Sequence, residues 1–221
     1  MAKDFQNKVV VERYDDHIRK LIPGYELVHQ QINAILTTYL TQSAHILVVG
    51  CGTGYELSYL LQQHPNWTFT AVDTSLTMLQ QAQHNLLNDQ NRVEFIHADI
   101  CDIPLTAQFD AAITILVGHF IAYEHKAKFY QAIFNQLKTS GYLLTYDLML
   151  APDPQTLTVI QHLVQHIGLS QQQSQKMLDR LKDDFQLLDI EEFQDYMINA
   201  GFKNIRSYCQ IIDYYGFLME K

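Results

Sequence analysis

The segment HILVVGCGTGYEL, residues 45–57, constrains the fold more than any other part of the sequence. Its unbroken apolar run is typical of a strand buried on both faces of a parallel sheet. Glycines at positions 50, 52 and 54 follow the run and lead into a helical pattern. Such a turn presents backbone N–H groups and the positive end of a helix to a ligand. The segment therefore predicts an α/β fold that binds a ligand at this turn.

Four further strand-like runs follow, at 67–72, 93–97, 109–116 and 142–148. Helical patterns lie between them, one beginning at Asp73-Thr74-Ser75 and one over 124–138, which we expect to end at a left-handed cap on Gly141. Strict alternation of strand and helix predicts a parallel, doubly wound sheet with helices on both faces.

The last 33 residues predict a different ending for the sheet. Asp189 and Glu192 form a capping pattern for a helix that ends at Gly201. The runs 204–212 and 214–221 lie too close together for a helical crossover, so we expect them to pair antiparallel. The predicted sheet has seven strands and is mostly parallel, with an antiparallel last strand.

Charge and composition limit the partners of the chain. A formal charge of −9 disfavours binding to nucleic acid or anionic lipid and leaves a small molecule as the expected partner. Three scattered cysteines suggest neither a disulfide framework nor a zinc site. The sequence contains no apolar stretch of membrane-spanning length, so we expect a cytoplasmic protein.

Two helical segments flank the strand-rich region. Residues 8–41 predict two helices broken at 22–26, and residues 155–184 predict another helical stretch after the prolines at 152 and 154. We interpret both as covers over the open end of the sheet. A single domain then comprises an N-terminal lid (1–43), a binding core (44–150), a second cover (151–188) and a last helix with its hairpin (189–221). The apolar stripe within 25–40 fits either the sheet or a second copy of the chain, which leaves a homodimer open.

The spacing of the glycines helps to choose the ligand. A dinucleotide fingerprint requires a third glycine at position 55, where this chain has Tyr55, and this disfavours a nicotinamide dehydrogenase. Asp73 ends the second strand, where a carboxylate can accept the hydrogens of both ribose hydroxyls. Asp99 ends the third strand, where it can bind an adenine amine while Ile100 covers the ring. Three strand ends would then bind one nucleoside.

These segments, in order, resemble the motifs of class I S-adenosylmethionine-dependent methyltransferases, a Rossmann-like family. The resemblance implies S-adenosyl-L-methionine as cofactor and a methyltransferase activity. It places the glycine turn at the methionine part, Asp73 at the ribose and Asp99 with Ile100 at the adenine. The cofactor-binding set predicted within the core is Gly50, Cys51, Gly52, Gly54, Asp73, Thr74, Asp99 and Ile100.

The chain departs from the family pattern two residues before the first glycine. Many members carry an acidic residue there, which helps to hold the methionine amino group, and this chain has Val48. Glu56, in the first turn of the following helix, can substitute for that acid, or can serve only as a favourable helix charge. A non-catalytic protein that binds the cofactor therefore remains an alternative.

A narrower resemblance links KLIPGYELVHQQI, residues 20–32, and the C-terminal segment to the carboxy-S-adenosylmethionine synthases. These relatives make a modified cofactor from S-adenosylmethionine and prephenate, and the resemblance implies that Tyr25 contacts the cofactor from the lid. That family depends on an arginine in the helical cover. Here the cover has Lys176, Arg180 and Lys182, none clearly in register, so the synthase is the second candidate.

His119 is the candidate catalytic residue. It follows the fourth strand at the ligand-binding edge, where an imidazole can remove a proton from a hydroxyl or ammonium acceptor. Tyr146 and Asp147, at the end of the fifth strand, border the same cleft and can orient a substrate. His162 and His166 lie four residues apart but have no third ligand, so no metal is predicted. The sequence does not identify the acceptor.

Overall fold

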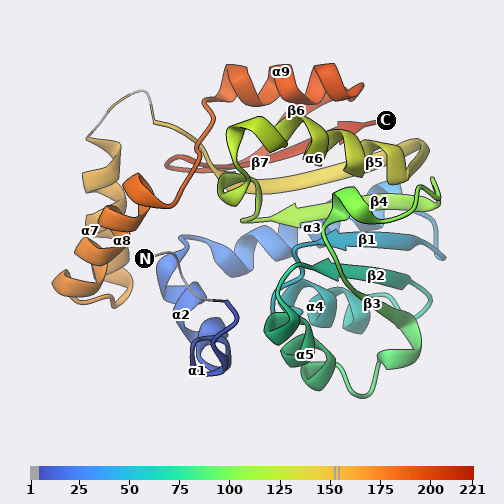
Figure 1. The fold of residues 1–221 in the computed structure, drawn as a ribbon, viewed down its shortest axis with the longest axis horizontal. Helices are drawn as coiled ribbons and strands as arrows, with labels where there is room; N and C mark the ends of the chain where they lie inside the picture. Colours follow the sequence, from blue (N-terminus) through green and yellow to red (C-terminus); the bar gives the residue numbers. More distant parts are fainter. Residues whose placement is uncertain (1–4, 152, 154) are drawn as a thin grey trace.

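The computed structural model describes residues 5–151, 153 and 155–221, which form one twisted sheet with helices on both faces (Figure 1). Its strand order is β3-β2-β1-β4-β5-β7-β6. Neighbours among the first five strands pair parallel, and β7 pairs antiparallel with β5 and β6. The strands are β1 (His45–Val49), β2 (Thr68–Asp73), β3 (Val93–His97), β4 (Phe109–Ile115), β5 (Leu137–Leu148), β6 (Lys203–Ile211) and β7 (Tyr214–Glu220). The predicted sheet of seven strands with an antiparallel ending is confirmed.

Alternate residues of each strand enter the two cores that flank the sheet. In β1, Ile46 and Val48 join one apolar cluster and Leu47 and Val49 join the other. This alternation follows from the two-residue period of a strand and explains why the run has no polar face. Helices α3 (Tyr25–Tyr39) and α4 (Tyr55–Gln63) contribute to the first core, and α6 (Tyr123–Gln136) and α9 (Ile190–Ala200) to the second.

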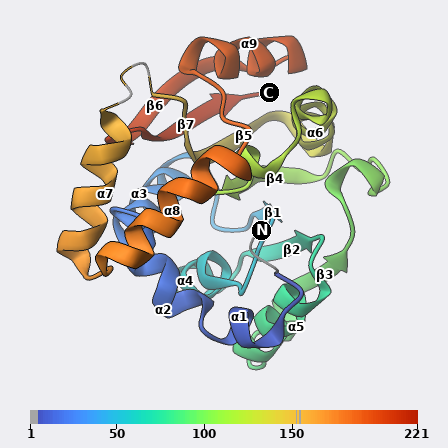
Figure 2. The same cartoon turned by 60° about the vertical axis from the view of Figure 1, so that its left-hand side comes forward.

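Four helices gather beyond one end of the sheet, on the left of Figure 1 and toward the viewer in Figure 2. These are α1 (Lys8–Glu12), α2 (Tyr14–Leu21), α7 (Thr156–Ile167) and α8 (Gln171–Asp183). The N-terminal cover is thus more broken than predicted, with an additional break at Arg13. The second cover consists of two helices separated at Gly168, whose φ is 126°. The prolines expected to form its joint, at 152 and 154, lie outside the described residues.

The expectation that residues 8–41 cover the end of the sheet is wrong for helix α3. This helix packs against a face of the sheet instead. Val28, Ile32 and Leu36 of its apolar stripe are buried in the first core. A face of the sheet offers more apolar area than its end, and the stripe is satisfied there within this chain.

Two local predictions are wrong. Gly141 is not a helix cap, because α6 ends at Gln136 and β5 begins at the next residue, so that Gly141 lies inside the strand. Glycine suits this strand position because a Cβ atom there would lie only 2.9 Å from the Lys138 carbonyl oxygen. The predicted strict alternation of strands and α-helices is also wrong between β3 and β4. There the described chain has only a short 3₁₀ helix, Ile100–Asp102.

The predicted helix starts hold. Helix α5 (Leu76–Asn85) begins after Ser75, whose hydroxyl accepts a hydrogen bond from the Met78 amide at 3.2 Å. Helix α9 begins with the capping box of Asp189 and Glu192 and ends at Gly201, whose φ is 105°. Within the part of the chain that the structure describes, every helix is too short or too polar to span a lipid bilayer.

Candidate functional site

The turn between β1 and α4 is left-handed at all three of its glycines. Gly50, Gly52 and Gly54 have φ values of 72°, 51° and 80°. The Gly50 amide donates a hydrogen bond to the Val72 carbonyl of the neighbouring strand at 2.8 Å. L-residues disfavour this backbone region, so glycine suits each of the three positions.

The surroundings of the three glycines differ. A Cβ atom on Gly50 would lie 2.4 Å from Val117, and one on Gly54 would lie 3.1 Å from Ala82 of α5. A Cβ atom on Gly52 would meet no atom within 4 Å. Gly50 and Gly54 therefore allow the protein to pack closely on itself, whereas Gly52 faces space that a ligand can fill.

Asp73, the last residue of β2, is held against this turn by two backbone amides. Its carboxylate accepts hydrogen bonds from the Gly52 amide at 2.8 Å and from the Ser75 amide at 2.7 Å. Burial raises the pKa of Asp73, and these two bonds oppose the rise. Each oxygen keeps a second lone pair, so the fixed carboxylate can still accept hydrogen bonds from a ligand.

A cavity of about 310 Å³, here called the strand-end cavity, lies at the carboxyl ends of β1, β2, β3 and β4. It brings together six of the residues predicted to bind the cofactor, namely Gly50, Gly52, Asp73, Thr74, Asp99 and Ile100. Asp99 also accepts a hydrogen bond from the Cys101 amide at 2.8 Å, which orients its carboxylate. The expectation that neighbouring strand ends converge on one space agrees with this arrangement.

The other three predicted residues do not line this cavity. Cys51 is buried behind the turn, where burial raises the pKa of its thiol. Gly54 contacts α5, as described above. Tyr25 packs in the first core, with its ring 4.6 Å from that of His29 and 5.3 Å from that of Tyr55. Burial, and after it the Glu56 carboxylate, raises the pKa of Tyr25. Tyr25 is absent from the residues that line the cavity.

Carboxylates gather beside the glycine turn. Asp15 of α2 accepts a hydrogen bond from the Thr53 hydroxyl at 2.5 Å. Glu56 is buried in the first turn of α4, and its pKa is raised to about 8, mainly by burial. A hydrogen bond from its own amide opposes the shift, while Asp73 and Asp15 add to it. Mutual repulsion in a buried setting means that a cation placed among these acids would be stabilised.

A second cavity, of about 240 Å³ and here called the side cavity, adjoins the strand-end cavity. The two share four lining residues, Phe5, Tyr14, Leu116 and Phe120. Helices α2 and α8, which lie on the same side of the molecule in both views, form much of the side cavity's wall (Figures 1 and 2). A ligand in the strand-end cavity and a second molecule in the side cavity would therefore be neighbours.

His119 lines the side cavity and is paired with Asp147. It belongs to the 3₁₀ helix Gly118–Phe120 that follows β4, and Asp147 lies near the end of β5. The His119 Nδ1 atom hydrogen-bonds to one oxygen of Asp147, and the His119 amide donates to the other at 3.1 Å. No hydrogen bond to Nε2 occurs among the described residues. The carboxylate thus fixes the imidazole while Nε2 remains available to a substrate.

A buried second layer supports this pair. Lys126, 1% exposed, donates a hydrogen bond from Nζ to the Gly118 carbonyl at 2.6 Å, and burial lowers its pKa to about 8. A Cβ atom on Gly118 would lie 2.6 Å from the Tyr130 hydroxyl and 2.7 Å from Asp147. Tyr146, predicted to border the cleft, instead donates to the Pro23 carbonyl at 3.2 Å within the core.

Sequence reasoning missed Phe5, Asp15 and Phe120. Phe120 adjoins His119 and could have been found from its position. Phe5 and Asp15 carry no such signal, because they reach the site only when the N-terminal segment folds back, with the Ser75 hydroxyl donating to the Phe5 carbonyl at 2.6 Å. In the described residues, His, Cys, Asp and Glu side chains form no group of three or more that could hold a metal ion.

Comparisons with known proteins support one family. The family model described as a methyltransferase domain matches residues 46–141. A carboxy-S-adenosyl-L-methionine synthase of Campylobacter concisus is 27% identical over 227 residues, covering 100% of this chain and 96% of the relative. A malonyl-[acyl-carrier protein] O-methyltransferase of Priestia megaterium is 30% identical over 142 residues, covering 62% of this chain and 50% of the relative.

A solved structure shows the same fold at low identity. The human N-acetylserotonin methyltransferase in complex with SAM aligns with a TM-score of 0.68 at 14% identity. The alignment covers 100% of this chain and 60% of that chain. The fold of the sheet and its helices is thus shared with a methyltransferase, and the alignment leaves the other two fifths of that protein's length without a counterpart in this chain.

Proposed function

We propose that this chain is a class I S-adenosylmethionine-dependent methyltransferase, which transfers a methyl group from S-adenosyl-L-methionine to a small molecule held in the side cavity. One observation carries the proposal: the strand-end cavity, with Gly52, Asp73 and Asp99 in its lining, directly adjoins the cavity lined by His119.

The residues of the strand-end cavity fit the cofactor. Asp73, fixed by two amides, suits the ribose hydroxyls, and Asp99 with buried Ile100 suits the adenine. The open space at Gly52 suits a chain passing close to the backbone. Tyr25, Cys51 and Gly54 act indirectly in this proposal, by shaping the turn and its acidic surroundings.

Glu56 is the proposed partner of the methionine ammonium group. The acid that many family members carry before the first glycine is replaced here by Val48, and Glu56 and Asp15 place carboxyl groups beside the turn instead. An ammonium group would stabilise the ionised Glu56 carboxylate, which burial, and to a lesser extent repulsion from Asp73 and Asp15, disfavours.

The chemistry divides between the two cavities. When bound, S-adenosylmethionine supplies a methyl group made electrophilic by its sulfonium. His119, oriented by Asp147, accepts the proton of the acceptor's hydroxyl at Nε2 as the acceptor oxygen is methylated. Phe5, Phe120 and Tyr14 enclose the junction of the cavities and exclude water. Alignment of the reactants can contribute roughly 7–11 kcal/mol to lowering the barrier in well-oriented systems.

The proposal extends to the organisation and location of the chain. Residues 1–43 and 151–188 would act as covers on a core of 44–150, completed by 189–221, as one domain. The net charge of −9 supports small molecules over nucleic acids as partners. We expect the enzyme to act in the cytoplasm.

Calorimetric titration with S-adenosylhomocysteine tests the cofactor site. We expect binding by the wild-type chain and a loss of about tenfold or more in Asp73→Ala, because hydrogen bonds to a charged group are lost. Asp102→Ala, an exposed acid just after Asp99 that does not line the cavity, is the control and should bind normally. Absence of binding to either S-adenosylhomocysteine or S-adenosylmethionine would reject the proposal.

A carboxy-S-adenosylmethionine synthase activity is the second candidate. The observation in its favour is that the Campylobacter concisus synthase matches along the whole chain, whereas the Priestia megaterium methyltransferase covers 62% of it. Incubation with S-adenosylmethionine and prephenate, followed by mass spectrometry of the nucleoside, separates the two candidates. A carboxylated product supports the synthase, and unchanged S-adenosylmethionine argues against it.

A further inference from the structure

The polar residues in the wall of the side cavity are basic or neutral. Helix α8 contributes Lys176 and Arg180, one turn apart on the same face, and α2 contributes His17. The rest of the wall is mostly apolar, including Ile18, Met177 and Leu181. No Asp or Glu lines this cavity among the described side chains, although the chain as a whole carries 24 acidic and 15 basic residues.

An outer groove continues the side cavity toward solvent. It shares His17 and Gln173 with the side cavity and carries Arg13 and Lys20, with Asp16 as its one acid among the described lining residues. A path of mainly positive charge therefore leads from the surface to an apolar chamber. Such a path raises the local concentration of anions and rejects cations.

The basic side chains lie at the mouth of the side cavity, whereas His119 lies at its inner end. The His119 side chain is 4% exposed, at the inner part of the cavity. The Arg180 side chain is 33% exposed, and Lys176 is exposed at the outer part. The Arg180 Nε atom contacts Asp184 at 3.5 Å, which leaves the two terminal guanidinium nitrogens for another acceptor. No ion pair of Lys176 occurs among the described side chains.

We propose that the acceptor is an elongated organic anion with an apolar body and a hydroxyl group. Its anionic group binds Lys176 and Arg180, its body packs against Ile18, Met177 and Leu181, and its hydroxyl reaches His119. This inference rests on the proposed function. In the reaction the acceptor oxygen gains a C–O bond, the S–CH₃ bond breaks to leave a neutral thioether, and the hydroxyl proton passes to His119.

Two matched probes test the inference without knowledge of the natural acceptor. 1-Anilinonaphthalene-8-sulfonate is an apolar body with one negative charge, and N-phenyl-1-naphthylamine has the same rings without the charge. We expect the anionic probe to bind more tightly by fluorescence titration, with an affinity that falls as salt is added. The affinity of the neutral probe should not depend on salt.

The double variant Lys176→Gln/Arg180→Gln should weaken the anionic probe by about tenfold and change the neutral probe by less than about twofold. Lys128→Gln/Lys203→Gln, which removes two exposed lysines outside both cavities, should leave both affinities unchanged. Equal affinity of the two probes, or an unchanged anionic affinity in the double variant, would overturn the inference.

Titration with S-adenosylhomocysteine separates this inference from the function on which it rests. Each variant should retain wild-type affinity for it, which also verifies folding. If the wild-type chain fails to bind S-adenosylhomocysteine, the proposed function is wrong. If it binds but shows no preference for the anionic probe, only the anionic acceptor is wrong.

Discussion

Binding of the proposed cofactor should change the protonation state of Glu56. Its pKa is raised to about 8, so it is mostly protonated below that pH in the free protein. If the cofactor's ammonium binds the carboxylate, binding must release a proton. We expect the affinity for S-adenosylhomocysteine to rise from pH 6 to pH 8, by at most about tenfold per pH unit.

The matched measurement uses Glu56→Gln. Calorimetry in two buffers of different ionisation enthalpy counts the protons released on binding. The wild-type chain should release a fraction of one proton at pH 7, and Glu56→Gln should bind more weakly and lose this component. Equal proton release in both proteins would mean that Glu56 does not face the ammonium.

The glycines of the turn allow a second prediction at the residue scale. Gly52→Ala and Gly54→Ala both place a side chain at positive φ, which costs about 1–2 kcal/mol of unfolding free energy. Only Gly52 faces open space, so only Gly52→Ala should also weaken S-adenosylhomocysteine binding in the fraction that folds. Denaturant unfolding and calorimetry on both variants check this. Equal binding losses would contradict the assignment of Gly54 to internal packing.

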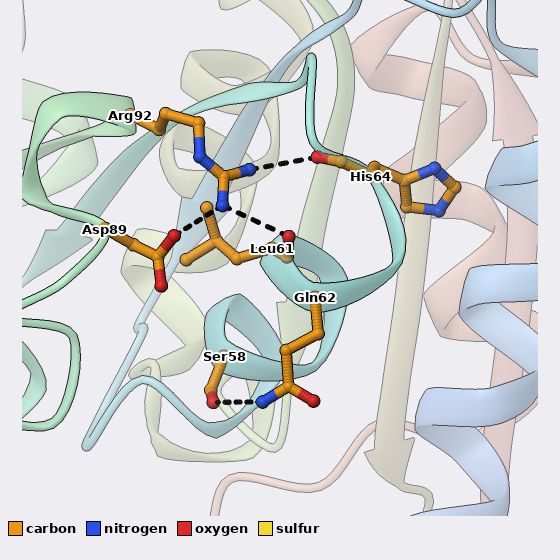
Figure 3. Close-up of polar contacts among 6 residues, drawn as sticks. All are labelled: Ser58, Leu61, Gln62, His64, Asp89 and Arg92. Carbon is orange, nitrogen blue, oxygen red and sulfur yellow. Dashed lines mark hydrogen bonds and ion pairs between the residues drawn. The ribbon is translucent and has the colours of Figure 1, made fainter.

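At the scale of elements, the C-terminal end of α4 is closed by Arg92, which follows α5 (Figure 3). Its guanidinium donates hydrogen bonds to the carbonyls of His64 at 3.0 Å and Leu61 at 3.1 Å and pairs with Asp89. These carbonyls lack partners within the helix, and a cation there also suits the helix dipole. Arg92 thereby anchors the helix whose first turn borders the cofactor site.

We expect Arg92→Met to lower the free energy of unfolding by about 2 kcal/mol, because charge-assisted hydrogen bonds are lost. Gln62→Ala removes an exposed contact to Ser58 on the same helix, shown in Figure 3, and should change it by less than about 0.5 kcal/mol. Chemical denaturation of both variants provides the comparison. An equal effect in both would show that the cap contributes little.

Helix α2 is attached to the glycine turn through Asp15 and Thr53, and this contact holds the N-terminal segment over the site. We expect Asp15→Asn to speed the dissociation of S-adenosylhomocysteine several-fold, on the order of 1 kcal/mol, because a charge-assisted bond is weakened. Asp16→Asn, an exposed acid on the same helix, is the control. Stopped-flow displacement measures both dissociation rates. An unchanged rate in Asp15→Asn would contradict the proposal that the Asp15–Thr53 hydrogen bond retains the ligand.

Elements whose ends carry their own local signal were predictable from the sequence. The Asp189 capping box, Ser75 and the apolar runs of the strands all hold in the structure. Gly141 misled the prediction because a glycine after a helix fits both a cap and a crowded strand position, and only the neighbouring Lys138 carbonyl distinguishes them. The break at Arg13 could not be predicted, because the sequence has no glycine or proline there.

At the scale of the whole molecule, the core of the site was predictable because parallel strands place their carboxyl ends at one edge. Asp73 and Asp99 needed only that rule to be brought into one cavity. The covers follow no such rule. The cavity contacts of Phe5 and Tyr14, and the alignment of Lys176 and Arg180 toward the side cavity, depend on how distant helices pack. Apart from His119, the acceptor side was therefore beyond sequence reasoning.

Two buried charges with opposite shifts predict how the stability of the ligand-free chain depends on pH. The Glu56 pKa is raised from 4.5 to about 8, so its contribution is full below about pH 4.5 and is lost as the pH rises to about 8. The Lys126 pKa is lowered from 10.5 to about 8, so its contribution is full above about pH 10.5 and is lost as the pH falls to about 8. The destabilisation that burial of the two groups causes is therefore largest near pH 8.

Urea unfolding at pH 6, 8 and 9.5 should show Glu56→Gln gaining stability relative to wild type from pH 6 to 8. Lys126→Met should lose stability relative to wild type from pH 8 to 9.5, and differences that stay constant with pH would contradict the burial of these two charges.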